Sequence, residues 1–107
     1  MTIPDEILEI KERIIAAVPT EKLYLFGSYA YGTPDEDSDY DFYVVLPNDC
    51  GLRPIEAAQG VYRSLRGMKR KPIDVLAGTV ERFEWRSRHF TLERDVVEKG
   101  VLLYEKS

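Results

Sequence analysis

The fold is decided by residues 23–46, which read LYLFGSYAYGTPDEDSDYDFYVVL. Two apolar runs within them, residues 23–26 and 40–46, are rich in aromatic and β-branched side chains and are typical of strands. Gly27 and Ser28 end the first run, and a loop crowded with carboxylates leads into the second. Because carboxylates are costly to bury, acids at the entrance of an apolar strand call for a physical explanation.

The acids at that entrance are Asp39 and Asp41. Side chains alternate along a strand, so both acids lie on one face, about 7 Å apart, while Tyr40 and Phe42 turn to the other face and the core. Two neighbouring carboxylates repel one another, which raises their pKa values unless a cation lies between them. Mg²⁺ suits such a pair, because it binds one or two carboxylates and keeps its other positions for water and phosphate. The alternative is an acidic strand end exposed to solvent.

Further residues around this pair favour a phosphate-handling site. Gly27 and Ser28 can offer backbone N–H groups and a hydroxyl to phosphate oxygens, and Ser38 offers a second hydroxyl beside the acids. Asp74 lies in the apolar run Pro-Ile-Asp-Val-Leu of residues 72–76. A third carboxylate there is a candidate general base or a third metal ligand in nucleotidyl transfer.

The rest of the chain alternates between helical and strand patterns. Apolar spacing predicts helices over residues 3–18 and 54–67, strands over 73–77 and 101–104, and a mostly helical segment over 80–100. The expected core contacts of that last segment are Phe83, Phe90, Leu92, Val96 and Val97. This order predicts a mixed α/β (α+β) fold, a small mixed sheet flanked by helices, formed by one domain over residues 1–107.

Composition limits the classes of function. The chain has 107 residues, 44% of them hydrophobic, and a net charge of -4, which argues against general binding of nucleic acid through phosphate attraction. Cys50 is the only cysteine, so no disulfide framework is expected and a reducing cytoplasm fits. No apolar stretch approaches the length of a membrane span. We therefore expect a cytoplasmic protein without a membrane-spanning segment.

Two basic groups allow two interpretations each. The first precedes the strand of Asp74 and could reach a phosphate or an acidic acceptor, or could be a solvated turn. Its members are Lys69, Arg70 and Lys71. The second gathers near Trp85 and could be a partner-binding face or an ordinary helix surface. Its members are Arg82, Arg86, Arg88 and His89.

Together these motifs resemble a known family. The segments Gly27-Ser28 and Asp39-Tyr40-Asp41-Phe42, followed by Asp74, are similar to the signature of the DNA polymerase beta type nucleotidyltransferase superfamily. The nearest branch is that of the minimal nucleotidyltransferases of bacteria and archaea, and the resemblance spans about residues 23–105. It implies the nucleotidyltransferase fold.

The resemblance also implies roles for the site residues. Gly27 and Ser28 would contact the triphosphate of ATP or another nucleoside triphosphate. Asp39 and Asp41 would bind two Mg²⁺ ions, and Asp74 would complete the catalytic site. The implied reaction transfers a nucleoside monophosphate, in the first place AMP, to a hydroxyl group. In this branch the acceptor can be a tyrosine of a small helical HEPN-type toxin, for which the transferase is the antitoxin.

The glycine segment departs from the family pattern. Many relatives carry one or two arginines there, where this chain has Tyr29 and Tyr31. Arginine pairs with phosphate through two bonds and tyrosine offers one neutral hydroxyl, so weaker triphosphate binding is expected. This motivates the alternative of a partner-binding antitoxin that keeps the fold without chemistry. The acceptor, the preferred nucleotide and the oligomeric state, including a homo-oligomer, stay open.

Overall fold

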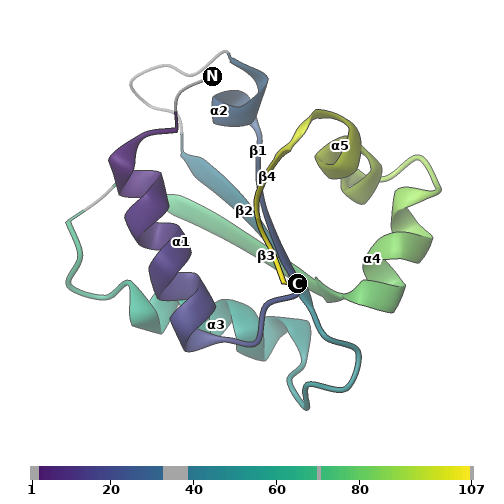
Figure 1. Cartoon of the computed structure of the whole chain (residues 1–107), viewed down its shortest axis with the longest axis horizontal. Helices are drawn as coiled ribbons and strands as arrows, with labels where there is room; N and C mark the ends of the chain where they lie inside the picture. The colour runs from purple at the N-terminus through teal and green to yellow at the C-terminus, as the bar shows by residue number, and fades with distance from the viewer. Residues whose placement is uncertain (1–2, 33–38, 70, 107) are drawn as a thin grey trace.

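The computed structural model describes residues 3–32, 39–69 and 71–106 (Figure 1). Helices and strands alternate along the chain much as the apolar patterns predict. In order they are α1 (Asp5–Ala17), β1 (Lys22–Phe26), α2 (Ser28–Tyr31), β2 (Tyr40–Leu46), α3 (Pro54–Ser64), β3 (Ile73–Thr79), α4 (Val80–Ser87), α5 (Leu92–Lys99) and β4 (Val101–Glu105). None of the helices in these ranges combines the length and apolar character that crossing a bilayer requires.

The four strands of the described chain form one mixed sheet in the order β3-β2-β1-β4. β1 runs antiparallel to β2 and to β4, whereas β2 and β3 are parallel and are joined through α3. Helices α1 and α3 lie on one side of the sheet and α4 and α5 on the other (Figure 1). The predicted mixed sheet with flanking helices is confirmed.

The main core lies between the sheet and the helices α1 and α3. Helix α1 contributes Ile7, Ile10 and Ile14, which recur at spacings of three and four residues and are fully buried. From β2 come Tyr40 and Phe42, both buried, as the alternation of side chains along the strand predicts. Asp41, which lies between them on β2, must therefore point to the opposite face.

That opposite face is only partly covered. Tyr43 of β2 packs against Phe83 of α4, with ring centroids 4.9 Å apart, and Val96 of α5 is fully buried in the same cluster. Along β3, however, Asp74 is exposed and Leu76 keeps 41% of its surface accessible. The part of this face over β3 is thus open to ligands.

The predicted helical segment 80–100 is two helices, because α4 ends at Ser87 and α5 begins at Leu92. The break changes which side chains face the sheet. Phe90 lies in the break and is 95% exposed, and Val97 and Leu92 are 47% and 41% exposed, so their expected core positions are wrong. The other two expected core contacts, Phe83 and Val96, are buried and confirmed.

Candidate active site

The register of the two parallel strands brings two of the predicted acids together. Asp41 of β2 and Asp74 of β3 are direct Cα partners in the ladder. Their neighbours Phe42 and Val75 are buried in the main core, so both acids belong to the opposite, open face. Asp39 precedes β2 and lies two residues before Asp41, which places it on the same side.

The pKa of the Asp41 carboxyl also reflects the charges of Asp74 and Asp39. Burial raises the pKa of this half-buried carboxyl, and the charges of Asp74 and then Asp39 raise it further. Asp74 and Asp39 are therefore close enough to Asp41 for their charges to act on it. A cation at this point would relieve the repulsion between these charges.

Gly27 packs directly against this acidic group. It has φ 77° and ψ -161°, a backbone conformation that is essentially restricted to glycine. A Cβ built on Gly27 would overlap Oδ2 of Asp41, since Phe26 at the end of β1 pairs with Asp41 in the sheet. The absence of a side chain at Gly27 thus makes the space that the Asp41 carboxylate occupies.

Ser28 begins a short helix that the apolar pattern does not predict. In α2 the backbone N–H groups of Ala30 and Tyr31 donate to the carbonyl of Gly27, and Gly32 ends the helix with φ 80°. The two glycines at positions 27 and 32 are the sequence signal for this turn, since both take positive φ. Ser28 is half-buried at the start of α2 and directly follows Gly27, which packs against Asp41.

The two tyrosines of α2 have different environments. Tyr29 packs edge to face on Tyr40, with ring centroids 4.7 Å apart, and belongs to the main core rather than to a phosphate site. Tyr31 is 42% exposed. The ammonium of Lys71 lies 5.9 Å from the centroid of the Tyr29 ring. The first basic group therefore brings a cation beside the glycine segment, where the sequence has no arginine.

One predicted site residue cannot be placed in this way. Ser38, the expected second hydroxyl for phosphate, lies outside the described residues, as does Arg70 of the first basic group. Lys69 is described and is exposed. The geometry of the site thus comes from Asp39, Asp41 and the residues around them.

The donor chemistry of the acids suits Mg²⁺, which prefers carboxylate oxygens. In residues 3–32, 39–69 and 71–106 no three His, Cys, Asp or Glu side chains are arranged as a ready ion cage. A three-carboxylate cage is not required, however, because protein-bound Mg²⁺ usually takes one or two carboxylates and completes its shell with water and phosphate. The adjacent Asp41 and Asp74, with Asp39 nearby, fit that mode of binding.

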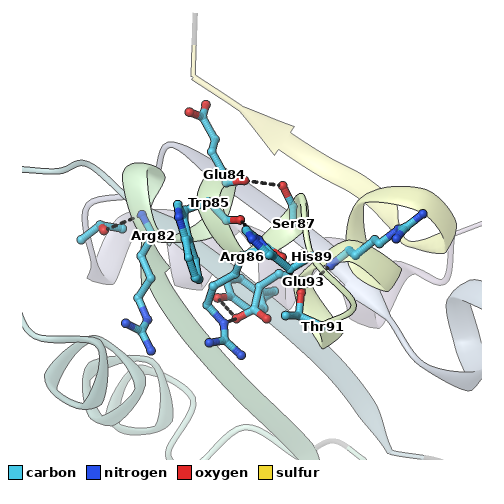
Figure 2. Close-up of polar contacts among 11 residues, drawn as sticks. Arg82, Glu84, Trp85, Arg86, Ser87, His89, Thr91 and Glu93 are labelled. Atoms are coloured by element: carbon cyan, nitrogen blue, oxygen red, sulfur yellow. Dashed lines mark hydrogen bonds and ion pairs between the residues drawn. The ribbon is translucent and has the colours of Figure 1, made fainter.

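A second polar cluster on the same face includes residues that the sequence analysis did not single out. Glu93 of α5 accepts hydrogen bonds at Oε2 from Tyr43 Oη at 2.9 Å and from Arg86 Nε at 3.0 Å (Figure 2). Trp85 and His89 lie against each other on the outside of α4, with ring centroids 4.3 Å apart. The second basic group therefore divides, because Arg86 turns inward to Glu93 while Arg88 and His89 stay exposed.

Known families and solved structures resemble this chain. The family model described as "Nucleotidyltransferase domain" matches residues 7–103. A putative nucleotidyltransferase from Sulfolobus solfataricus superposes with a TM-score of 0.62 and 23% identity over 92% of this chain and 76% of that one. A toxin–antitoxin complex with AMP-PNP gives a TM-score of 0.56 and 25% identity over 94% and 73%. A mutant of the toxin–antitoxin MntA-HpeT gives 0.59 and 23% over 96% and 73%. Among curated proteins none matches.

Proposed function

Since the chain belongs to the nucleotidyltransferase domain family, we propose that it transfers AMP from ATP to a hydroxyl group and releases pyrophosphate. The observation that carries this proposal is the pairing of Asp41 with Asp74 across two parallel strands, with Asp39 near enough to act on the same carboxyl. A solvated acidic strand end would need neither this pairing nor a glycine packed against one of the carboxylates. Nucleotidyl transfer accounts for both, because it brings phosphate and metal together at one point.

The residues divide the work of binding. Gly27 and Ser28 would hold the triphosphate through backbone N–H groups and the hydroxyl. Asp39 and Asp41 would hold the two divalent ions, which when bound supply charge neutralisation and polarise the α-phosphate.

Asp74 is the candidate general base. It is exposed, so a hydroxyl acceptor can approach it, and its strand lies on the far side of β2 from Gly27. An in-line displacement needs the leaving pyrophosphate and the attacking hydroxyl on opposite sides of the α-phosphorus. The hydroxyl oxygen forms the new bond to phosphorus and its proton passes to Asp74, while the bond to the pyrophosphate oxygen breaks.

The acceptor we propose is a tyrosine of a HEPN-type protein partner. Support comes from the likeness to a toxin–antitoxin complex that contains AMP-PNP, at 25% identity. The chain would then act as an antitoxin that modifies its toxin. A cytoplasmic setting, expected from the lone Cys50, is part of this proposal.

The test is a transfer assay with labelled ATP, Mg²⁺ and the protein encoded next to this one. Wild-type protein should label the partner, whereas Asp39→Asn and Asp41→Asn should lower the rate at least a hundredfold, because each removes a metal-binding charge. Asp49→Asn is the matched control, since Asp49 is exposed in the turn after β2, at its opposite end, and should leave the rate unchanged. Equal labelling by wild type and both site variants would exclude the enzymatic proposal.

The second candidate is an antitoxin that binds its partner without chemistry. The observation in its favour is that Tyr29 is committed to core packing, so no side chain of α2 offers a phosphate the paired bonds of an arginine. Here Asp41→Asn should leave both partner binding and neutralisation of the toxin intact. Loss of neutralisation with binding retained would decide for the enzyme.

A further inference from the structure

A pocket of about 550 Å³ opens on the uncovered face, between β3 and the helices α4 and α5. Its size is within the range of small-molecule sites. Residues on its lining include Tyr43, Leu76, Thr79, Arg82, Arg86 and Glu93. None of these is among the site residues of the proposed reaction, so the proposed reaction leaves the function of this pocket unassigned.

One lining residue of the pocket, Glu93, carries a carboxylate. The residue is 8% exposed, and its Oε2 is already bonded to Tyr43 and Arg86. Its other oxygen, Oε1, is buried and accepts no hydrogen bond from another described residue. A buried carboxylate oxygen without a partner is costly, and as a pure acceptor it can be satisfied only by a donor. A ligand that reaches this oxygen from the pocket must therefore offer an N–H or O–H group.

The arginines complement this carboxylate. Arg82 and Arg86 are one helical turn apart, and their guanidinium groups extend to the same side of α4 (Figure 2). Arg86 is held by Glu93, but the Arg82 guanidinium makes no hydrogen bond or ion pair with a described residue. Leu76 supplies a partly exposed apolar surface on β3. A flat ring can lie on such a surface and stack on a guanidinium plane.

The distance between the pocket and the acids is comparable with the length of a nucleoside. A Cβ on Gly78 would lie 2.9 Å from Tyr43 Oη, so the hydroxyl that holds Glu93 lies at the level of Gly78. Gly78 pairs with Val45, four residues along β2 from Asp41, which is about 13 Å in an extended strand. An attacking hydroxyl must sit at the acids themselves, whereas a base is held away from the α-phosphate by its ribose. The position of the pocket thus favours the base over the acceptor.

We propose that this pocket binds the base of the nucleotide, with an exocyclic amino group donating to Glu93 Oε1 and Arg82 stacked on the ring. The inference rests on the proposed function, because it assumes a triphosphate at Gly27 and the acids. Adenine, guanine and cytosine carry such an amino group. Uracil does not, and the carbonyl oxygens on both sides of its N3–H would be repelled by the carboxylate. The pocket therefore selects amino-bearing bases.

The test measures equilibrium binding of three probes, ATP, UTP and inorganic tripolyphosphate, each with Mg²⁺, by calorimetry. Wild type should bind ATP about tenfold more tightly than UTP, the value of one hydrogen bond to a charged group. Glu93→Gln should lower the affinity for ATP about tenfold and leave tripolyphosphate unchanged. Arg82→Gln should weaken ATP and UTP alike, about threefold, through lost stacking.

Arg88→Gln is the matched control, because it removes the same charge from an exposed position outside the pocket and should change none of the three affinities. Equal binding of ATP and UTP by wild type, or unchanged ATP binding in Arg82→Gln, would overturn the inference. So would an equal loss of ATP and tripolyphosphate affinity in the variants, since this would assign the pocket to phosphate. Failure of wild type to bind tripolyphosphate and ATP at all would instead refute the proposed function.

Glu93→Gln could disturb folding, since Glu93 joins two helices to the sheet. Thermal melts accompany the titrations for this reason. Arg82→Gln tests the stacking on the ring separately, because the Arg82 guanidinium makes no hydrogen bond or ion pair with a described residue. A loss of nucleotide affinity without a loss of tripolyphosphate affinity in that variant supports a base site in the pocket, and the preference of wild type for ATP over UTP tests the amino contact with Glu93.

Discussion

Replacing Gly27 by alanine tests whether this glycine makes the space for Asp41. At φ 77° and ψ -161° an alanine pays about 1–3 kcal/mol in backbone strain. Its Cβ would also overlap Asp41 Oδ2, so the carboxylate must move. Gly32→Ala is the matched control, since Gly32 also has positive φ, at 80°, but a Cβ there meets nothing within 4 Å. The control should cost only about 1 kcal/mol.

We expect Gly27→Ala to lower the free energy of unfolding by about 3 kcal/mol, roughly 2 kcal/mol more than the control, as the sum of strain and displacement. For a domain of this size the extra loss lowers Tm by about 10 °C relative to Gly32→Ala. Urea unfolding followed by circular dichroism measures the difference, and ATP binding with Mg²⁺ measures the loss of the site. Combining Gly27→Ala with Asp41→Ala should recover about 1 kcal/mol, because the overlapping oxygen is gone. Equal stability of the two alanine variants, with ATP binding retained by Gly27→Ala, would refute the reasoning.

Three further outcomes follow from burial and charge. Burial raises the pKa of Glu93, but hydrogen bonds from its own backbone, Arg86 and Tyr43 outweigh burial and lower the pKa overall. The charged Glu93 carboxylate therefore stabilises the folded protein fully above its unfolded pKa, near 4.3, and this stabilisation is lost as pH falls through the lower folded pKa. Acid unfolding of Glu93→Gln should lack this contribution. Phe42→Ala should cost about 3–5 kcal/mol in urea unfolding, whereas Phe90→Ala, at a 95% exposed ring, should change stability by less than about 0.5 kcal/mol. Asp41→Asn should lower the transfer rate at least a hundredfold yet slightly raise Tm in Mg²⁺-free buffer, because it removes a carboxylate whose pKa is raised by burial and then by the charges of Asp74 and Asp39; a lower Tm would contradict the crowding of the acids.

Much of the fold could be predicted because local periodicity reflects the side chain's environment. The alternation in residues 40–46 assigned Tyr40 and Phe42 to the core, and both are buried. Periodicity failed in segment 80–100, where Phe90 is exposed in the break between two helices. Hydrophobic character alone does not say which apolar residue meets the sheet once a helix is interrupted and its phase is reset.

The candidate site, too, could be predicted from the sequence only in part. The positions of Asp39, Asp41 and Asp74 were selected from the sequence because each is an acid within or beside an apolar strand. That Asp41 and Asp74 are neighbours depends on β2 and β3 pairing in parallel, a contact between residues far apart in the chain. Glu93 was missed because nothing in a helical charge pattern distinguishes a buried carboxylate from a solvated one.

The sequence by itself determined the four strands, the helices before β1 and before β3, and which residues carry the acids, because helical and strand periods are local properties. Only the tertiary structure decided that Gly27 contacts Asp41, that Lys71 lies beside α2 and that Glu93 forms an ion pair with Arg86. Each of these contacts joins separate elements, and their relative position depends on sheet register and helix packing, which no short stretch of sequence encodes.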